Sequence, residues 1–97
     1  MNSNLIGKEG EIAPEVVRFL SLLYKNTVFF GPIPLSEAIT LATEEMNLSK
    51  FEILALYYKA KRESLIQVEC LKDPYSSLKT YVSIAGKGLQ ALMEVIH

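Results

Sequence analysis

The sequence predicts a mostly helical α+β fold with the order helix, short strand, helix, helix, β-hairpin and C-terminal helix. Two observations lead to this prediction. Within the stretch from Leu48 to Ile66, Ser49 and Glu52 have the spacing of a capping box, and the apolar residues that follow recur with the period of an α-helix. Directly after this helix, alternating apolar and polar residues predict a strand, and an Asp-Pro turn predicts that the chain returns as a hairpin.

The 97-residue chain has the length and composition of one globular domain, with 49% apolar and 22% charged residues. Its longest apolar runs are far shorter than the roughly 20 residues that cross a bilayer, and its first residues do not resemble a signal peptide. We therefore expect a cytoplasmic protein with no membrane partner. Cys70 is the only cysteine, and its place in an alternating segment favours a small core residue over a redox sensor.

The first predicted helix follows a segment without hydrophobic period, residues 1–12, which we expect to be a flexible arm. Pro14 suits the first turn of a helix that runs to Asn26. Apolar side chains cover nearly the whole circumference of this helix, which is more than one small core hides, so we expect it to bury a second face against a partner chain. These side chains are Val16, Val17, Phe19, Leu20, Leu22, Leu23 and Tyr24.

A helix-turn-helix is predicted next. The extended segment 27–34 contains two prolines and predicts a short edge strand near Ile33. A helix then runs from Leu35 or Ser36 to Met46, and residues 47–48 turn the chain into the capped helix. Two helices joined by so short a link must cross at an angle, which is the helix-turn-helix arrangement.

The capped helix has two different faces and leads into a hairpin. On one side lie the expected core residues Ile53, Leu56, Tyr57 and Ala60; on the other lie Phe51, Ala55, Tyr58 and Arg62, with Lys59 at the border. The hairpin is predicted from strands at 65–71 and 80–84 and a polar turn at 72–79, and residues 85–97 form a last helix with an apolar stripe. This order defines a winged helix-turn-helix, in which the capped helix is the recognition helix and the hairpin is the wing.

Charge is distributed unevenly, although the net charge of the chain is only −1. Residues 1–49 carry three basic and six acidic side chains and are therefore −3, while residues 50–97 carry seven basic and five acidic ones and are +2. Because fields fade within about 8 Å at physiological salt, a local basic surface attracts phosphate even on a nearly neutral protein. The alternative interpretation is that these are ordinary solvated charges.

The order and spacing of several short phrases resemble the winged-helix transcriptional regulators, most nearly a minimal MarR-type (multiple-antibiotic-resistance regulator) protein. In that family the recognition helix opens with Leu-Ser, as residues 48–49 do, and ends in a Gly-Leu-Ile/Val phrase, whose place residues 64–66 take. The family's wing opens with a basic Asp-Pro phrase, matched at 72–74, and returns through a strand like 81–84. Its last helix opens with Lys-Gly, matched at 87–88.

Three features differ from the family pattern, one of which is a second helix about a turn longer than usual. The arginines that are usual at the wing tip are replaced by residues 75–78, Tyr-Ser-Ser-Leu. The outward face of the recognition helix offers Phe51, Ala55 and Tyr58 where polar base-reading side chains are common.

The resemblance implies a sequence-specific double-stranded DNA-binding protein that regulates transcription as a homodimer through its first and last helices. It implies a recognition helix in the major groove and a wing on the backbone or in the minor groove. The expected DNA-contacting residues are Lys50, Phe51, Glu52, Ala55, Tyr58, Lys59, Arg62, Lys72, Tyr75, Ser76, Ser77 and Lys79. The alternative is a winged-helix protein–protein interaction module, because the fold serves both uses.

Catalytic and metal-binding constellations are not apparent in the sequence. His97 is the only histidine and ends the chain, so we expect neither a catalytic dyad nor a histidine metal cluster, and the single cysteine excludes a multi-cysteine metal site. We expect no enzymatic activity, no metal and no cofactor.

Overall fold

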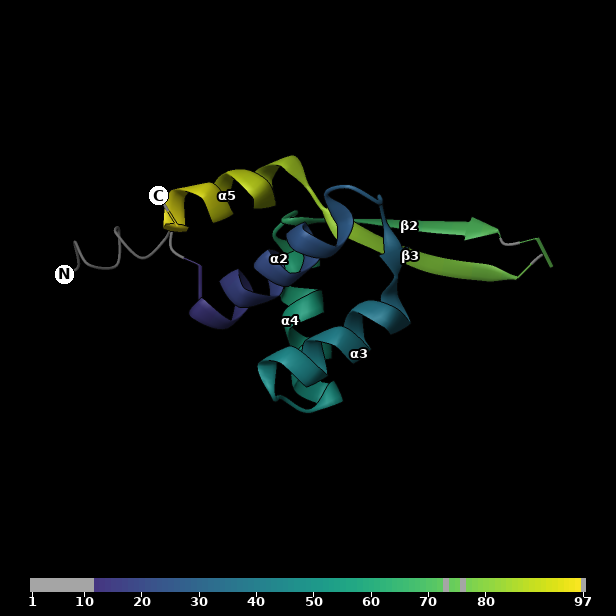
Figure 1. Cartoon of the computed structure of the whole chain (residues 1–97), viewed down its shortest axis with the longest axis horizontal. Helices are drawn as coiled ribbons and strands as arrows, with labels where there is room; N and C mark the ends of the chain where they lie inside the picture. The colour runs from purple at the N-terminus through teal and green to yellow at the C-terminus, as the bar shows by residue number, and fades with distance from the viewer. Residues whose placement is uncertain (1–11, 73, 76, 97) are drawn as a thin grey trace.

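The computed structural model describes residues 12–72, 74–75 and 77–96. The described part contains four helices and three strands in the predicted order (Figure 1). The elements are α2 (Pro14–Thr27), β1 (Ile33–Pro34), α3 (Leu35–Met46), α4 (Lys50–Arg62), β2 (Ile66–Lys72), β3 (Leu78–Ile84) and α5 (Gly86–Ile96). Most of the predicted flexible arm lies outside the described residues, and Ile12, at its end, is half-buried against the core.

Helix α2 forms the centre of the molecule. Helices α3 and α4 pack on one side of it and α5 on the other (Figure 1). Five of its seven apolar residues are buried in the core of the same chain, while Val17 and Tyr24 are half-buried. The prediction that this helix exceeds what one small core can hide is therefore wrong, because three other helices and the sheet surround it.

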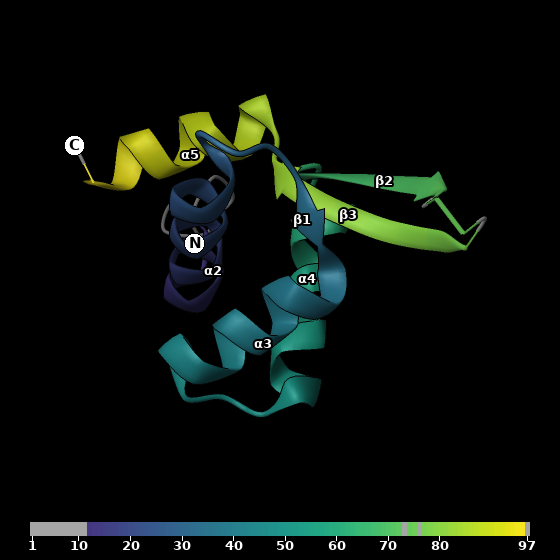
Figure 2. The ribbon, with the colours of Figure 1, turned by 45° about the vertical axis from the view of Figure 1, so that its right-hand side comes forward.

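The three strands form an antiparallel sheet in the order β1-β3-β2. The edge strand β1 lies beside β3 (Figure 2), and this pairing places Ile33 opposite Val82. Strands β2 and β3 pair from Ile66 opposite Ile84 to Lys72 opposite Leu78. They therefore extend further toward the turn than predicted, and the outer half of the hairpin projects beyond the helices (Figure 1).

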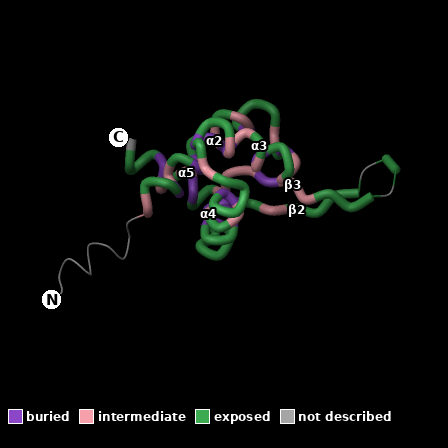
Figure 3. Tube along the Cα trace, turned by 90° about the horizontal axis from the view of Figure 1, so that it is seen from below, coloured by how far each residue is buried: buried purple, intermediate pink, exposed green. Residues whose placement is uncertain are grey.

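Burial along the hairpin changes sharply with distance from the core. Ile66 and Val82 are buried at its root, whereas β2 is exposed from Glu69 onward (Figure 3). Cys70 is exposed, with its Sγ 3.8 Å from Thr80 Oγ1. The prediction that Cys70 is a small core residue is wrong, because no helix of the described part covers this half of the wing.

Two left-handed residues and one close approach fix how the recognition helix joins its neighbours. Asn47 ends α3 at a φ of 56°, and Ser64 follows α4 at a φ of 61°. The Leu65 carbonyl oxygen then accepts a hydrogen bond from Ala85 N–H at 3.0 Å. Gly88 packs directly against this carbonyl group, so the root of the hairpin and the first turn of α5 are held together.

Candidate DNA-binding interface

The start of α4, the predicted recognition helix, is fixed by its capping box. Glu52 N–H donates to Ser49 Oγ at 3.2 Å, and Ser49 N–H donates to Glu52 Oε1 at 2.9 Å. These bonds satisfy two backbone donors that the first turn would otherwise leave without partners. The Glu52 carboxylate, predicted to contact DNA, thus has a structural role in the helix itself.

The two faces of α4 are as predicted. Ile53, Tyr57 and Ala60 are buried, and Leu56 is half-buried. On the opposite face, Phe51, Ala55, Tyr58 and Arg62 are exposed, and so is Lys59 at its border. The other two residues of α4 that were predicted to contact DNA, Lys50 and Glu52, are exposed as well. Phe51 is 81% and Tyr58 60% exposed, which is unusual for large apolar side chains on a helix that has its own core face.

Tyr57 and Tyr58 connect the two faces. Their ring centroids are 4.9 Å apart with planes at 64°, which is an edge-to-face pair. Burial raises the pKa of the Tyr57 phenol above its ordinary 10.0, and the neighbouring Tyr58 and Cys70 raise it further. Tyr57 is therefore a neutral, buried residue whose ring packs edge-to-face against the exposed ring of Tyr58.

Basic side chains lie at both ends of α4. Lys50 is the first residue of the helix, and Lys59, Lys61 and Arg62 lie in its last turn. Cations in a last turn also interact favourably with the helix dipole, by about 0.3 to 1 kcal/mol at exposed positions. The three C-terminal bases consequently have a structural explanation as well as a phosphate-binding one.

The wing carries the remaining predicted residues. Lys72 and Lys79 are exposed on β2 and β3, and Tyr75 and Ser77 are exposed in the turn between them. Ser76, also predicted to contact DNA, lies outside the described residues. Lys72 pairs with Leu78, and Lys79 pairs with Leu71, so the two lysines point to opposite faces of the hairpin.

Two open hollows lie between the wing and the start of α4, over the outer face of α3. The first, of about 300 Å³, is lined by Pro34, Leu35, Ser36, Ile39, Lys79 and Thr80. The second, of about 280 Å³, is lined by Ser36, Ile39, Thr40, Thr43 and Lys50. Because the hollows share Ser36 and Ile39, they form one continuous surface that carries hydroxyl groups and has a lysine at each end.

The hydroxyls of this surface were not among the predicted site residues. Thr40 Oγ1 donates to Ser36 O at 3.0 Å, and Thr43 Oγ1 donates to Thr40 O at 2.8 Å, so both hydroxyls are occupied as donors. No bond of the Ser36 hydroxyl is found within residues 12–72, 74–75 and 77–96. In the sequence, these residues resemble the polar face of any amphipathic helix, and only their place between Lys50 and Lys79 distinguishes them.

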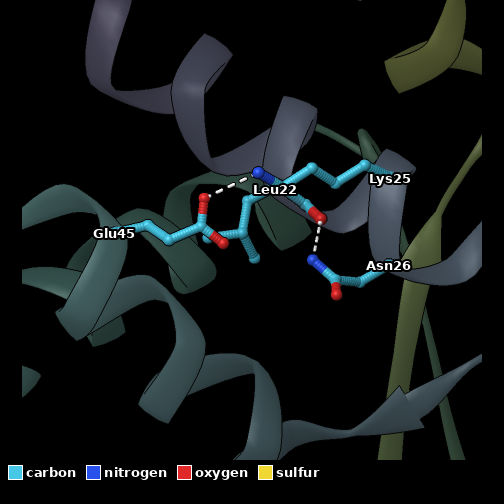
Figure 4. A network of polar contacts seen from close by, with 4 residues as sticks. All are labelled: Leu22, Lys25, Asn26 and Glu45. Carbon is cyan, nitrogen blue, oxygen red and sulfur yellow. Dashed lines mark hydrogen bonds and ion pairs between the residues drawn. The ribbon is translucent and has the colours of Figure 1, made fainter.

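The acidic end of α3 faces away from this surface. Glu45 Oε1 lies 2.7 Å from Lys25 Nζ on α2, and Asn26 Nδ2 donates to Leu22 O at 2.8 Å nearby (Figure 4). Both charged side chains of the ion pair are substantially exposed, so the pair is worth at most about 1 kcal/mol. Its importance is that Glu45 is directed toward α2 and does not line the hollows that Lys50 and Lys79 border.

In the described part of the chain, no group of three or more histidine, cysteine, aspartate or glutamate side chains could hold a metal ion. No helix of that part is long and apolar enough to cross a membrane.

The arrangement of helices, sheet and hairpin is that of a winged helix-turn-helix protein, and solved structures of that class resemble it. A PadR-like transcriptional regulator from Bacillus cereus strain ATCC 14579 is 20% identical over 96% of this chain and 82% of its own, with a TM-score of 0.61. Bacillus subtilis PadR, solved in complex with operator DNA, is 15% identical over 84% of this chain, also with a TM-score of 0.61. This chain spans 45% of that PadR chain.

Comparison of the sequence alone adds no family. No protein-family model matches the chain, and no curated protein matches it significantly. The similar solved structures confirm the predicted winged helix-turn-helix fold. The MarR type is not confirmed, since the similar structures are PadR-like.

Proposed function

We propose that this protein is a sequence-specific double-stranded DNA-binding regulator of transcription that acts in the cytoplasm without enzymatic activity or cofactor. Helix α4 enters the major groove, and the wing contacts the backbone or the minor groove. The observation that carries this proposal is that the outward face of α4 is wholly exposed although the helix is firmly capped and packed. An α-helix with side chains is about 10 to 12 Å across, which matches a major groove about 12 Å wide.

Phosphate contacts come from the bases that border this face. Lys50 and Lys79 lie at the two ends of the hydroxyl-bearing surface over α3, and Arg62 ends the recognition helix. Ser36 extends this set, because its hydroxyl can donate to a phosphate oxygen between the two lysines. These contacts set affinity and register and carry little sequence information.

Base contacts come from the centre of the outward face. Phe51, Ala55 and Tyr58 can pack on thymine methyl groups, and the Tyr58 hydroxyl can form a hydrogen bond with a base edge. The Tyr57 ring behind Tyr58 limits the positions that the Tyr58 ring can adopt. A restrained aromatic ring favours sequence-dependent contact, because less side-chain freedom is lost on binding.

We further propose that the regulator binds as a homodimer whose two recognition helices lie about 34 Å apart, one turn of DNA. Since α2 is mostly buried in its own chain, the contact rests on other exposed apolar side chains. Those nearest the predicted first and last helices are Val28, Phe29 and Phe30 after α2, and Met93 and Val95 on α5. Sedimentation equilibrium at tens of micromolar should give twice the monomer mass of 10.9 kDa.

The test of DNA binding uses duplexes enriched by the protein from a random-sequence library, compared with scrambled duplexes by fluorescence anisotropy at two salt concentrations. We expect affinity for every duplex to fall as salt rises, and the enriched sequence to be preferred at both concentrations. Tyr58→Ala should reduce this preference by about 1 to 3 kcal/mol while leaving binding to the scrambled duplex nearly unchanged. Tyr58→Phe is the matched control, because it keeps the ring pair with Tyr57 and removes only the hydroxyl.

The exposure of Phe51 and Tyr58 also favours a second candidate, a winged-helix module that binds another protein. On a protein partner these two aromatic side chains would be buried anchors, and truncation of such anchors to alanine commonly costs about 2 kcal/mol or more. Absence of any preferred duplex, together with loss of a co-purifying protein in Tyr58→Ala, would replace the DNA-binding proposal by this one.

A further inference from the structure

The outer half of the wing has an unusual composition in its last two paired positions. Each rung joins one leucine to one lysine: Leu71 opposite Lys79, and Lys72 opposite Leu78. Because neighbouring residues of a strand point to opposite faces, each face of the hairpin carries one leucine beside one lysine. Leu78 is 72% and Leu71 45% exposed, and Tyr75 in the turn is 88% exposed.

No helix of the described part of the chain reaches the outer half of the hairpin that carries these leucines. The hairpin extends beyond every helix (Figure 1), and its outer half is exposed on both strands (Figure 3). The same strands bury Ile66 and Val82 at the root, so the exposure of the leucines follows from their distance from the core. A solvated strand position more often carries a polar residue, and two leucines on opposite faces of one projection indicate contact with another molecule.

We propose that the outer half of the wing is an apolar wedge that enters the minor groove, opens a base step and bends the DNA. This inference rests on the proposed function and adds a mechanical consequence to it. The lysine beside each leucine indicates that the binding partner is DNA. Each face of the hairpin offers an apolar side chain and a cation, which match the apolar sugars inside the minor groove and the phosphates along its rims.

The dimensions of the hairpin require the groove to change shape. A hairpin with side chains on both faces is about 10 Å thick, which is the spacing of sheets that stack face to face, whereas the minor groove of B-form DNA is about 6 Å wide. A hairpin with a leucine on each face can therefore insert only if the groove widens. Apolar side chains that enter a widened minor groove partly unstack a base step and kink the duplex toward the major groove by about 20° to 90°.

The charges near the wedge come from few residues. Lys72 and Lys79 lie on its two faces, and Glu69, opposite Tyr81, is the nearest described acid along β2. Asp73 is the other acid of the sequence in this segment and lies outside the described residues. The rungs that enter the groove thus carry two positive charges and no negative one, while Glu69 remains nearer the body of the protein.

The experiment measures bending and binding separately on one duplex of about 30 base pairs, enriched from a random library by the wild-type protein. Resonance energy transfer between dyes at its two ends reports bending, and 2-aminopurine placed in the flanks reports unstacking. We expect saturating wild-type protein to raise both signals. The double variant Leu71→Ser/Leu78→Ser should bind about ten-fold more weakly and, at saturation, raise neither signal.

The matched control replaces the lysine of each leucine–lysine pair instead of the leucine. Lys72→Ala/Lys79→Ala should weaken binding to every duplex and lower the salt slope by about two units, while the bend at saturation stays as in the wild type. Gln67→Ser, an exposed position nearer the root of the same strand, should leave the bend and the 2-aminopurine signal unchanged. Circular dichroism checks that each variant is folded, which their exposure leads us to expect.

Four results would overturn the wedge. Tight, sequence-dependent binding by wild-type protein without a change in either signal would do so and would leave the proposed function intact. Bending by the leucine variant equal to that of the wild type would also overturn the wedge and leave the proposed function intact. So would loss of self-association by the leucine variant in the absence of DNA, because the leucines would then contact a second copy of the chain. Failure of the wild type to bind any duplex at low salt would overturn the proposed function, and the wedge with it.

Discussion

The root and the outer half of the β-hairpin are built from the same two strands, yet they have opposite surroundings. At the root, Ile66 and Val82 are buried in contact with the helices, and the Ala85 N–H donates to Leu65 O beside Gly88. In the outer half, Leu71 and Leu78 are as apolar as the root residues but are exposed. Burial of a strand residue in this molecule is therefore decided by how far the helices reach along the sheet.

This difference separates stability from function. Residues at the root hold α4, the sheet and α5 together, so their substitution should change the free energy of unfolding. Leu71 and Leu78 of the outer half are exposed, so their substitution should change binding more than stability. The following predictions test where the boundary between the two halves lies.

The largest effect is expected at the root. Ile66→Ala removes a buried side chain opposite Ile84 and should lower the free energy of unfolding by about 3 kcal/mol. Leu78→Ala, in the outer half of the same sheet, should change it by less than about 0.5 kcal/mol. Urea denaturation of both variants at equal protein concentration measures the two values. Comparable losses in the two variants would mean that the outer half of the wing is covered in the folded protein.

Much of this fold could be predicted because the relevant signals are local. The Ser49 and Glu52 capping box fixed the start of α4, and helical periodicity separated its buried face from its exposed face. Pro14 marked the start of α2, and α3 ends at Met46 as predicted. In each case a few neighbouring residues determine the backbone, so no tertiary contact had to be known. The predicted end at Asn26 was wrong, because α2 continues through Thr27 and its C-cap, Val28, is right-handed.

The errors occurred where burial depends on distant parts of the chain. Alternation correctly grouped Cys70 with Ile66 on one face of β2, but it could not show that the core ends before residue 70. The apolar circumference of α2 was interpreted as an excess, although helices on both sides of α2 bury it. Ser36 could not be recognised as part of the candidate site, because its position between Lys50 and Lys79 exists only in three dimensions.

A smaller but still clear effect is expected where α5 meets the root. A Cβ atom on residue 88 would overlap the Leu65 carbonyl oxygen and lie 2.9 Å from the carbonyl carbon, and neither backbone atom can move without disturbing the bond from Ala85. Gly88→Ala should therefore lower the free energy of unfolding by about 2 kcal/mol.

Gly86→Ala is the matched control for Gly88→Ala. A Cβ atom there meets nothing within 4 Å, and alanine suits a helix better than glycine, so stability should stay equal or rise by up to about 1 kcal/mol. Thermal unfolding of the two variants compares them directly. If Gly88→Ala were as stable as Gly86→Ala, the close contact between α5 and the root would not hold in solution.

The smallest effect concerns Tyr57, which belongs to the core face of α4 but lies close enough to the exposed Cys70 of the wing to be influenced by its charge. Burial, then Tyr58 and Cys70, raise the pKa of the Tyr57 phenol above 10.0, so the folded protein holds this proton more tightly than the unfolded chain. The resulting stabilisation is complete below pH 10 and is lost as the pH rises from there through the raised pKa. Tyr57→Phe keeps the ring and removes the titrating group, so its stability should be close to that of the wild type at pH 7 and should fall less steeply above pH 10. Urea denaturation between pH 7 and pH 11 measures the difference, and a constant gap across that range would mean that Tyr57 is as open to water as the outer half of the wing.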